Sequence, residues 1–187
     1  MSAITRKSPS EVALMARAGA IVAEVLALVE ELAVPGASTA EIDARAEAHL
    51  AAAGAGSNFK GYHGFPAVIC LSIDAEVVHG IPGDREIRAG SVVSVDAGAT
   101  WQGWHADAAR TFHVGPAAPD VIRLISGTRA ALDAGIGAAR SGATVEEISA
   151  AVEDAALAAR LGIVRPYVGH GIGRACLLYT SDAADEG

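Results

Sequence analysis

The sequence is poor in cysteine, has no cluster of basic residues, and has no long apolar run free of charges. Cys70 and Cys176 are its only cysteines, too few for a disulfide framework, so we expect a reducing, cytoplasmic location. The formal net charge is -8 without any Lys/Arg-rich stretch, which argues against direct binding of nucleic acid or anionic lipid. A hydrophobic content of 51% with 19% charged residues predicts a soluble globular domain.

Charged residues also interrupt the apolar stretch near the N-terminus. We therefore predict a helix of a globular domain there and no membrane segment. The interrupting residues are Glu11, Arg17, Glu24, Glu30 and Glu31.

Three capping boxes predict helix starts. Ser8 with Glu11, Ser38 with Glu41, and Thr144 with Glu147 each place a hydroxyl three residues before a glutamate. Apolar residues at helical spacing follow each box. Between the second and third boxes, residues 59–114 carry turn glycines and prolines and the β-rich runs "AVICLSI", "SVVSV" and "ARTFHV", which predict strands.

A repeated sequence motif suggests that the chain contains two related halves. "GASTAEI" from Gly36 resembles "GATVEEI" from Gly142, 106 residues later. Chance similarity between two alanine-rich helical hairpins is the alternative. If the halves are related, few residues after Gly162 remain for the strands of the second half, so we expect that half to be incomplete.

The composition changes after Arg174. The segment "ACLLYTSDAADEG" fits neither a capped helix nor a strand flanked by turns, and "CLLYTSDAADE" is similar to a translation of a transposase end sequence used in DNA library preparation. We expect residues 175–187 to be a non-native tail behind a single domain over residues 1–174. An ordinary acidic C-terminus is the alternative.

Two aspartates stand in β-rich surroundings within "SVVSVDAGATWQGWHADAARTFHVG". A hairpin turn of two or four residues near Trp101–Trp104 would bring Asp96 and Asp107 to one face of the sheet. Two facing buried carboxylates repel, and a shared divalent cation relieves both the repulsion and the desolvation. The alternatives are a pair that shares a proton, or a three-residue turn that sends one aspartate to the opposite face.

Histidines supply further candidates for the same chemistry. His79 precedes a Gly-Ile-Pro turn and His170 lies between glycines in "VGHGIG", so each can point into a cleft as a metal ligand or a proton shuttle. A purely structural histidine is the alternative for both. His63 is a weaker candidate, and His105 and His113 on either side of Asp107 are left out of the site.

With these residues assembled, the chain resembles type I (bacterial-type) methionine aminopeptidase from about Ser8 to Arg174. The motifs that carry the resemblance are "GYHGFPAVICLSIDAEVVHGIPGD", "GSVVSVDAGATWQGWHADAARTFHVG" and "YVGHGIGR". It implies an α+β pita-bread fold, with two pseudo-symmetric halves around a curved antiparallel sheet. It also implies metal-dependent removal of the initiator methionine from nascent polypeptides, including at the ribosome, by a monomer.

The resemblance also assigns roles within a site for two divalent ions (Co, Mn, Fe or Zn). Asp96 would hold one ion, Asp107 would bridge both, and His170 would bind the other. His79 would hydrogen-bond the substrate beside the scissile amide. The expected substrate-binding residues are Tyr62, His63, Phe65, Cys70 and His79.

Some parts of the family pattern have no match. A second active-site histidine and two glutamate ligands are missing, and Phe59 stands where bacterial members often carry cysteine. The 187-residue polypeptide is therefore expected to be inactive and to bind metal weakly. The alternatives are a prolidase-type Xaa-Pro hydrolase, which carries a sizeable preceding domain, and a non-catalytic pita-bread binding protein.

Overall fold

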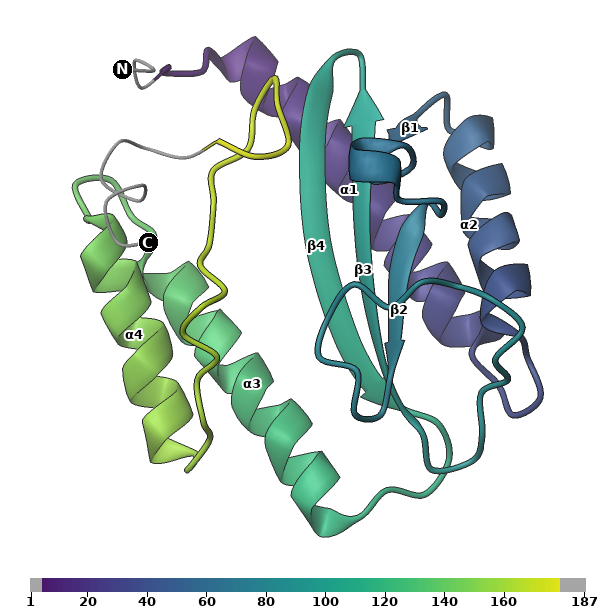
Figure 1. Cartoon of the computed structure of the whole chain (residues 1–187). Coiled ribbons are helices and arrows are strands. Elements are labelled where there is room, and N and C mark those ends of the chain that lie inside the picture. Colours follow the sequence, from purple (N-terminus) through teal and green to yellow (C-terminus); the bar gives the residue numbers. More distant parts are fainter. Residues whose placement is uncertain (1–4, 179–187) are drawn as a thin grey trace. The chain divides into compact units, whose positions relative to one another are not determined.

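The computed structural model describes residues 5–178 (Figure 1). Its elements are α1 (Pro9–Leu32), α2 (Thr39–Ala52), β1 (Gly56–Ser57), a short 3₁₀ helix η1 (Tyr62–Gly64), β2 (Ile69–Ile73), β3 (Val92–Trp101), β4 (Trp104–His113), α3 (Pro119–Ala138) and α4 (Val145–Ala158).

Two compact units make up the described chain. One contains the described residues up to Gly115 together with those from Gly169 onward, and the other is Pro116–Val168. The expectation of a single domain over residues 1–174 stays a prediction. Of the expected tail over residues 175–187, residues 179–187 lie outside the described part.

The three predicted capping boxes are present. In each, the side-chain hydroxyl of the cap residue (Ser8, Ser38 or Thr144) accepts a hydrogen bond from the backbone N–H of the glutamate three residues later. The carboxylate of that glutamate accepts a hydrogen bond from the backbone N–H of the cap residue. These reciprocal bonds satisfy amide groups that a helix start otherwise leaves unpaired.

Strand β3 is the centre of the sheet. It pairs antiparallel with β2 through residues 93–97, with β1 at Ala99 and Thr100, and with β4 along its other edge. Strictly alternating residues of β3 are buried among helix residues, namely Val93, Val95, Ala97 and Ala99. We call this side the core face and the opposite side, with Asp96, the site face.

Helix α1 covers the core face together with α2 (Figure 1). It is also the described helix that is long and apolar enough to cross a membrane by length and composition, with a mean hydropathy of 2.1 over its most apolar window. The sequence predicts that charged residues interrupt every apolar run, but one window within α1 still meets the length and composition of a membrane span. In the structure 33% of that window is buried. The buried residues of α1 pack in the core; they are Ala18, Ile21, Val22, Val25, Leu26 and Val29.

Helices α3 and α4 lie in the second unit. Small residues allow them to approach closely: a Cβ at Gly127 would lie 2.8 Å from the Ala159 Cβ, and one at Gly135 would lie 2.7 Å from Val152 Cγ2. The second unit is therefore a tightly packed helical hairpin.

Candidate active site

The β3–β4 hairpin determines where the two aspartates point. Trp101 pairs with Trp104, which leaves a two-residue turn of Gln102 (φ 49°) and Gly103 (φ 76°). Positive φ at both positions is typical of the type I′ turn, whose twist matches that of the strands. Asp107 is directly opposite Gly98, two residues from Asp96. Both aspartates therefore emerge on the site face as diagonal neighbours, which confirms the predicted geometry.

The two carboxyl groups interact directly. Burial raises the pKa of Asp96 to about 7, and the negative charge of Asp107 and a hydrogen bond between the two side chains add to this effect. Asp96 therefore keeps its proton to a higher pH than an exposed aspartate does. A divalent cation replaces such a proton, so the donor set of two carboxylates suits a hard or borderline metal ion.

Two thiols flank the carboxylates. Cys70 is directly opposite Asp96 in the register of β2 and β3, and burial followed by the nearby aspartates raises the pKa of its thiol to about 12. On the other side, the Cys176 thiol donates to Asp107 Oδ2 across 3.4 Å, and burial and Asp107 raise its pKa to about 11. Both thiols are therefore neutral at physiological pH.

A polar cluster adjoins Asp107 at the hairpin end of the site face. Asn58 Oδ1 lies 2.7 Å from Thr100 Oγ1 and 2.8 Å from His105 Nδ1, and its Nδ2 donates to the Ala106 carbonyl at 2.9 Å. Burial lowers the pKa of His105. Sequence reasoning missed Asn58 and set His105 aside. A glycine inside a strand, Gly98, was the available signal, because such a glycine often marks a close approach of other atoms.

His79 lies in an exposed loop that is anchored to β2. It has a left-handed backbone (φ 60°), and the next residue, Gly80, accepts from the Leu71 amide and donates to Ser72 Oγ. A Cβ at Gly80 would lie 2.4 Å from the Leu71 carbonyl oxygen. Only glycine therefore fits there, and this close contact fixes the loop beside the strand that carries Cys70.

The expected pocket residues lie around η1. Glycines 61 and 64 have positive φ on either side of Tyr62 and His63, whose rings meet edge to face with centroids 4.3 Å apart. The Phe65 carbonyl accepts from the Gly61 amide and closes the turn. Tyr62 is 54% exposed, so its ring is accessible to a ligand.

His170 belongs to the segment 169–178, which lies against β4. The His105 amide donates to the Gly173 carbonyl, and the Arg174 guanidinium lies 4.3 Å from the centre of the Trp104 ring. His170 itself is exposed. Within residues 5–178, no three His, Cys, Asp or Glu side chains are placed to hold a metal ion. The structure thus joins the two aspartates and does not gather His170 with both of them.

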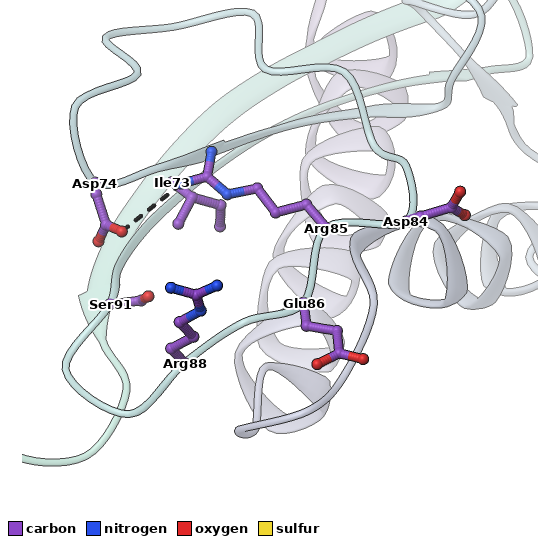
Figure 2. Close-up of a pocket in the computed structure, with 7 residues that line it drawn as sticks. All are labelled: Ile73, Asp74, Asp84, Arg85, Glu86, Arg88 and Ser91. Atoms are coloured by element: carbon purple, nitrogen blue, oxygen red, sulfur yellow. Dashed lines mark ion pairs between the residues drawn. The ribbon is translucent and has the colours of Figure 1, made fainter.

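A cavity of about 430 Å³ lies beyond the end of β2. Figure 2 shows charged side chains around it, including an ion pair between Arg85 and Asp74 at 3.7 Å. Arg85 also pairs with Glu76 at 2.8 Å. None of the predicted site residues lines this cavity, and its charged lining does not suit a thioether side chain.

Comparison with known proteins identifies the family. The profile of metallopeptidase family M24 matches residues 13–179. The chain belongs to this family. Methionine aminopeptidase 1 of Mycobacterium tuberculosis is 44% identical over 178 residues, which cover 91% of this chain and 67% of that protein. Methionine aminopeptidase 1 of Bacillus subtilis is 39% identical over 168 residues, which cover 90% and 68%.

Two solved structures share the fold. Methionine aminopeptidase from Rickettsia prowazekii superposes with a TM-score of 0.92 at 31% identity, covering 95% of this chain and 72% of that one. Prolidase from Pyrococcus furiosus gives a TM-score of 0.80 at 20% identity, covering 93% and 50%, which shows a common fold alone. These likenesses confirm the α+β pita-bread fold, incomplete here, and the resemblance to methionine aminopeptidase. The prolidase alternative is not favoured.

Proposed function

We propose that this chain is the metal-binding part of a methionyl aminopeptidase, a metalloexopeptidase that removes the N-terminal methionine from polypeptides. One observation carries the proposal: the register of β3 and β4 places Asp96 and Asp107 as diagonal neighbours on the site face. The membership of family M24 and the identity to methionine aminopeptidases support it.

Asp96 and Asp107 would hold a divalent metal, with His170 as a further ligand. The donors are oxygen and imidazole, which suit cobalt, manganese, iron or zinc, and a second ion would share Asp107. When bound, the metal polarises the scissile carbonyl as a Lewis acid.

The substrate would lie between the carboxylates and η1. His79 would hydrogen-bond the peptide beside the scissile amide. Tyr62, His63 and Phe65 would surround the methionine side chain, and the neutral thiol of Cys70 would close the pocket beside Asp96. A thioether packs well against such aromatic and sulfur-containing walls.

The substrates would be nascent polypeptides with a free N-terminal methionine, in the cytoplasm and including those at the ribosome. The enzyme would act as a monomer. The acidic balance of the chain, with a net charge of -8, gives no support for direct contact with RNA.

Metal binding tests the proposal. Isothermal titration calorimetry with Mn²⁺ and Co²⁺ is expected to show binding to the unaltered chain. Asp96→Asn and Asp107→Asn are each expected to weaken it by more than about ten-fold, because each removes a ligand rather than a neighbour of one. Asp133→Asn is the control, since Asp133 is an exposed residue of α3 in a pair with Arg129. Equal affinity in all four proteins would refute the metal assignment.

Peptides test the substrate class and the activity separately. In the presence of Mn²⁺, Met-Ala-Ser is expected to bind and the reordered peptide Ala-Met-Ser is not. The 187-residue chain is expected to leave Met-Ala-Ser intact, because its sequence has no match for the second active-site histidine and the two glutamate ligands of the family pattern. Turnover would contradict this inactivity, and equal binding of both peptides would contradict the methionine pocket.

A further inference from the structure

Asn58 crosses the sheet on the site face. It directly follows β1, and its backbone N–H donates to the Gly98 carbonyl of β3 at 3.1 Å. Its side chain then passes over Gly98 to the Ala106 carbonyl and the His105 ring of β4. Asn58 therefore links the strands on both sides of β3.

Gly98 makes this path available. A Cβ at position 98 would lie 2.6 Å from Asn58 Nδ2 and 2.8 Å from Asn58 Cβ, closer than side-chain atoms pack. The Asn58 side chain therefore fills the volume that any other residue at position 98 would occupy. Gly98 is also directly opposite Asp107, so the amide of Asn58 lies beside that carboxylate.

The contacts fix the orientation of the Asn58 amide. Nδ2 faces the Ala106 carbonyl, which only accepts, so Oδ1 is the atom that faces Thr100 and His105. Since Oδ1 only accepts as well, both the Thr100 hydroxyl and His105 Nδ1 must donate to it. His105 therefore carries its proton on Nδ1, and Nε2 keeps its lone pair.

We propose that Asn58 is a positioning residue for the metal-binding carboxylate Asp107, laid across Gly98 to hold the Ala106 carbonyl and the Nδ1–H form of His105. The metal part of this inference rests on the proposed function, because it takes Asp107 as a ligand. Asn58 fixes the residues at one and two positions before Asp107, so it acts on that carboxylate without touching a metal.

Cys176 gives an independent sign that the Asn58 amide and the Asp107 carboxylate face a common point. Its sulfur lies 3.4 Å from Asn58 Nδ2 and 3.4 Å from Asp107 Oδ2. The second amide hydrogen of Asn58 thus points to the sulfur atom that also contacts the Asp107 carboxylate.

The His105 tautomer is the first test, and it needs no metal. In the unaltered chain with ¹⁵N-labelled histidine, NMR is expected to show Nδ1–H for His105, assigned by comparison with His105→Gln. In Asn58→Ala, the Thr100 hydroxyl loses its acceptor and is free to donate to Nδ1, so the proton moves to Nε2. Nε2–H in the unaltered chain would overturn the proposal, as would a tautomer that Asn58→Ala leaves unchanged.

Metal affinity is the second test. Calorimetry with Mn²⁺ is expected to show binding about ten-fold to a hundred-fold weaker in Asn58→Ala, the range typical of residues that orient a ligand. Thr111→Val is the matched control. It removes another cross-strand bond of the same face, the 2.8 Å contact between Ser94 and Thr111, and is expected to bind like the unaltered chain. Unchanged affinity in Asn58→Ala would overturn the positioning role.

Gly98→Ala keeps the proposal testable if Asn58→Ala fails to fold. The added methyl displaces Asn58, so Gly98→Ala is expected to weaken Mn²⁺ binding as Asn58→Ala does, with no further loss in the double variant. Additive losses would overturn the proposal. Asn58 is the single asparagine of the chain, so ¹⁵N-asparagine labelling follows its amide in each protein. Failure of the proposed function has a different pattern: the unaltered chain binds no ion while His105 keeps Nδ1–H, which would overturn the positioning role and leave a structural contact only.

Discussion

The two helical hairpins, α1–α2 and α3–α4, are built from the same local elements. In each, a long helix leads to a glycine with positive φ, Gly36 at 91° and Gly142 at 89°. A capping box two residues later starts a second helix of 14 residues. The repeat seen in the sequence is therefore also a repeat of local structure.

Burial separates the two hairpins. Helix α1 has six buried apolar or alanine residues against the sheet, whereas α3 has only Gly127, Ala131 and Gly135 buried and α4 only Ala156. Large apolar residues of the second hairpin are exposed instead, namely Ile122, Leu124, Leu132, Ile136, Val145, Val152 and Leu157.

The two hairpins show which features the local sequence determines and which depend on packing against another element. Caps and turns give both hairpins the same helices, because their hydrogen bonds are made within a few residues. The depth of burial depends on whether a sheet covers the apolar face. The two hairpins should therefore respond alike to changes in caps and differently to changes in apolar side chains.

The largest expected effect is a difference in stability loss between substitutions in the two long helices, α1 and α3. Ile21→Ala removes a side chain that is 0% exposed, and Ile136→Ala one that is 63% exposed. The first should lower the free energy of unfolding by about 2–5 kcal/mol through the cavity that it leaves, and the second by less than about 0.5 kcal/mol. Both losses of free energy are measured by urea unfolding, with hydrogen exchange of the α1 and α3 amides as the local readout. Equal losses would show that the α3 face is covered.

An intermediate effect concerns the contact between α3 and α4. Gly127→Ala places a methyl against Ala159 Cβ and Leu161 Cδ1, both 2.8 Å away. Such overpacking costs about 1–3 kcal/mol, which outweighs the roughly 1 kcal/mol that alanine gains over glycine inside a helix.

Gly137→Ala is the matched control in the same helix, because a Cβ there meets no atom within 4 Å. It should stabilise α3. Thermal unfolding followed by circular dichroism compares the two variants, and stabilisation by Gly127→Ala would show that the helices do not approach so closely.

The smallest expected effect tests the shared local structure. Ser38→Ala and Thr144→Ala each remove a cap that accepts a glutamate amide at 3.2 Å. Each should destabilise its own helix by about 1 kcal/mol. Hydrogen exchange at the first amides of α2 and α4 reports the loss, and a much larger loss at Ser38 would mean that its cap also supports tertiary contacts.

The sequence predicted the parts of the fold and site that short spacings determine. The caps, the strand segments and the meeting of Asp96 with Asp107 all follow from periods and turn lengths within the chain. The contacts of Asn58 could not be predicted in this way. They join residues 48 and 47 positions apart and depend on the pairing of β1 with β3, which no local pattern specifies. The roles of His79 and His170 stay predictions for a similar reason, because each depends on loops placed by distant contacts.

The pairing of Trp101 with Trp104 has a consequence for where genes of this kind can vary in length. Side chains alternate between the two faces along a strand, so one codon inserted or deleted between Trp104 and Asp107, with this pairing kept, would move Asp107 to the face packed against α1. Its carboxylate would then be enclosed among apolar side chains, on the opposite side of the sheet from Asp96. Length changes between the turn and Asp107 should therefore survive selection only in even steps, whereas a longer turn can keep the register.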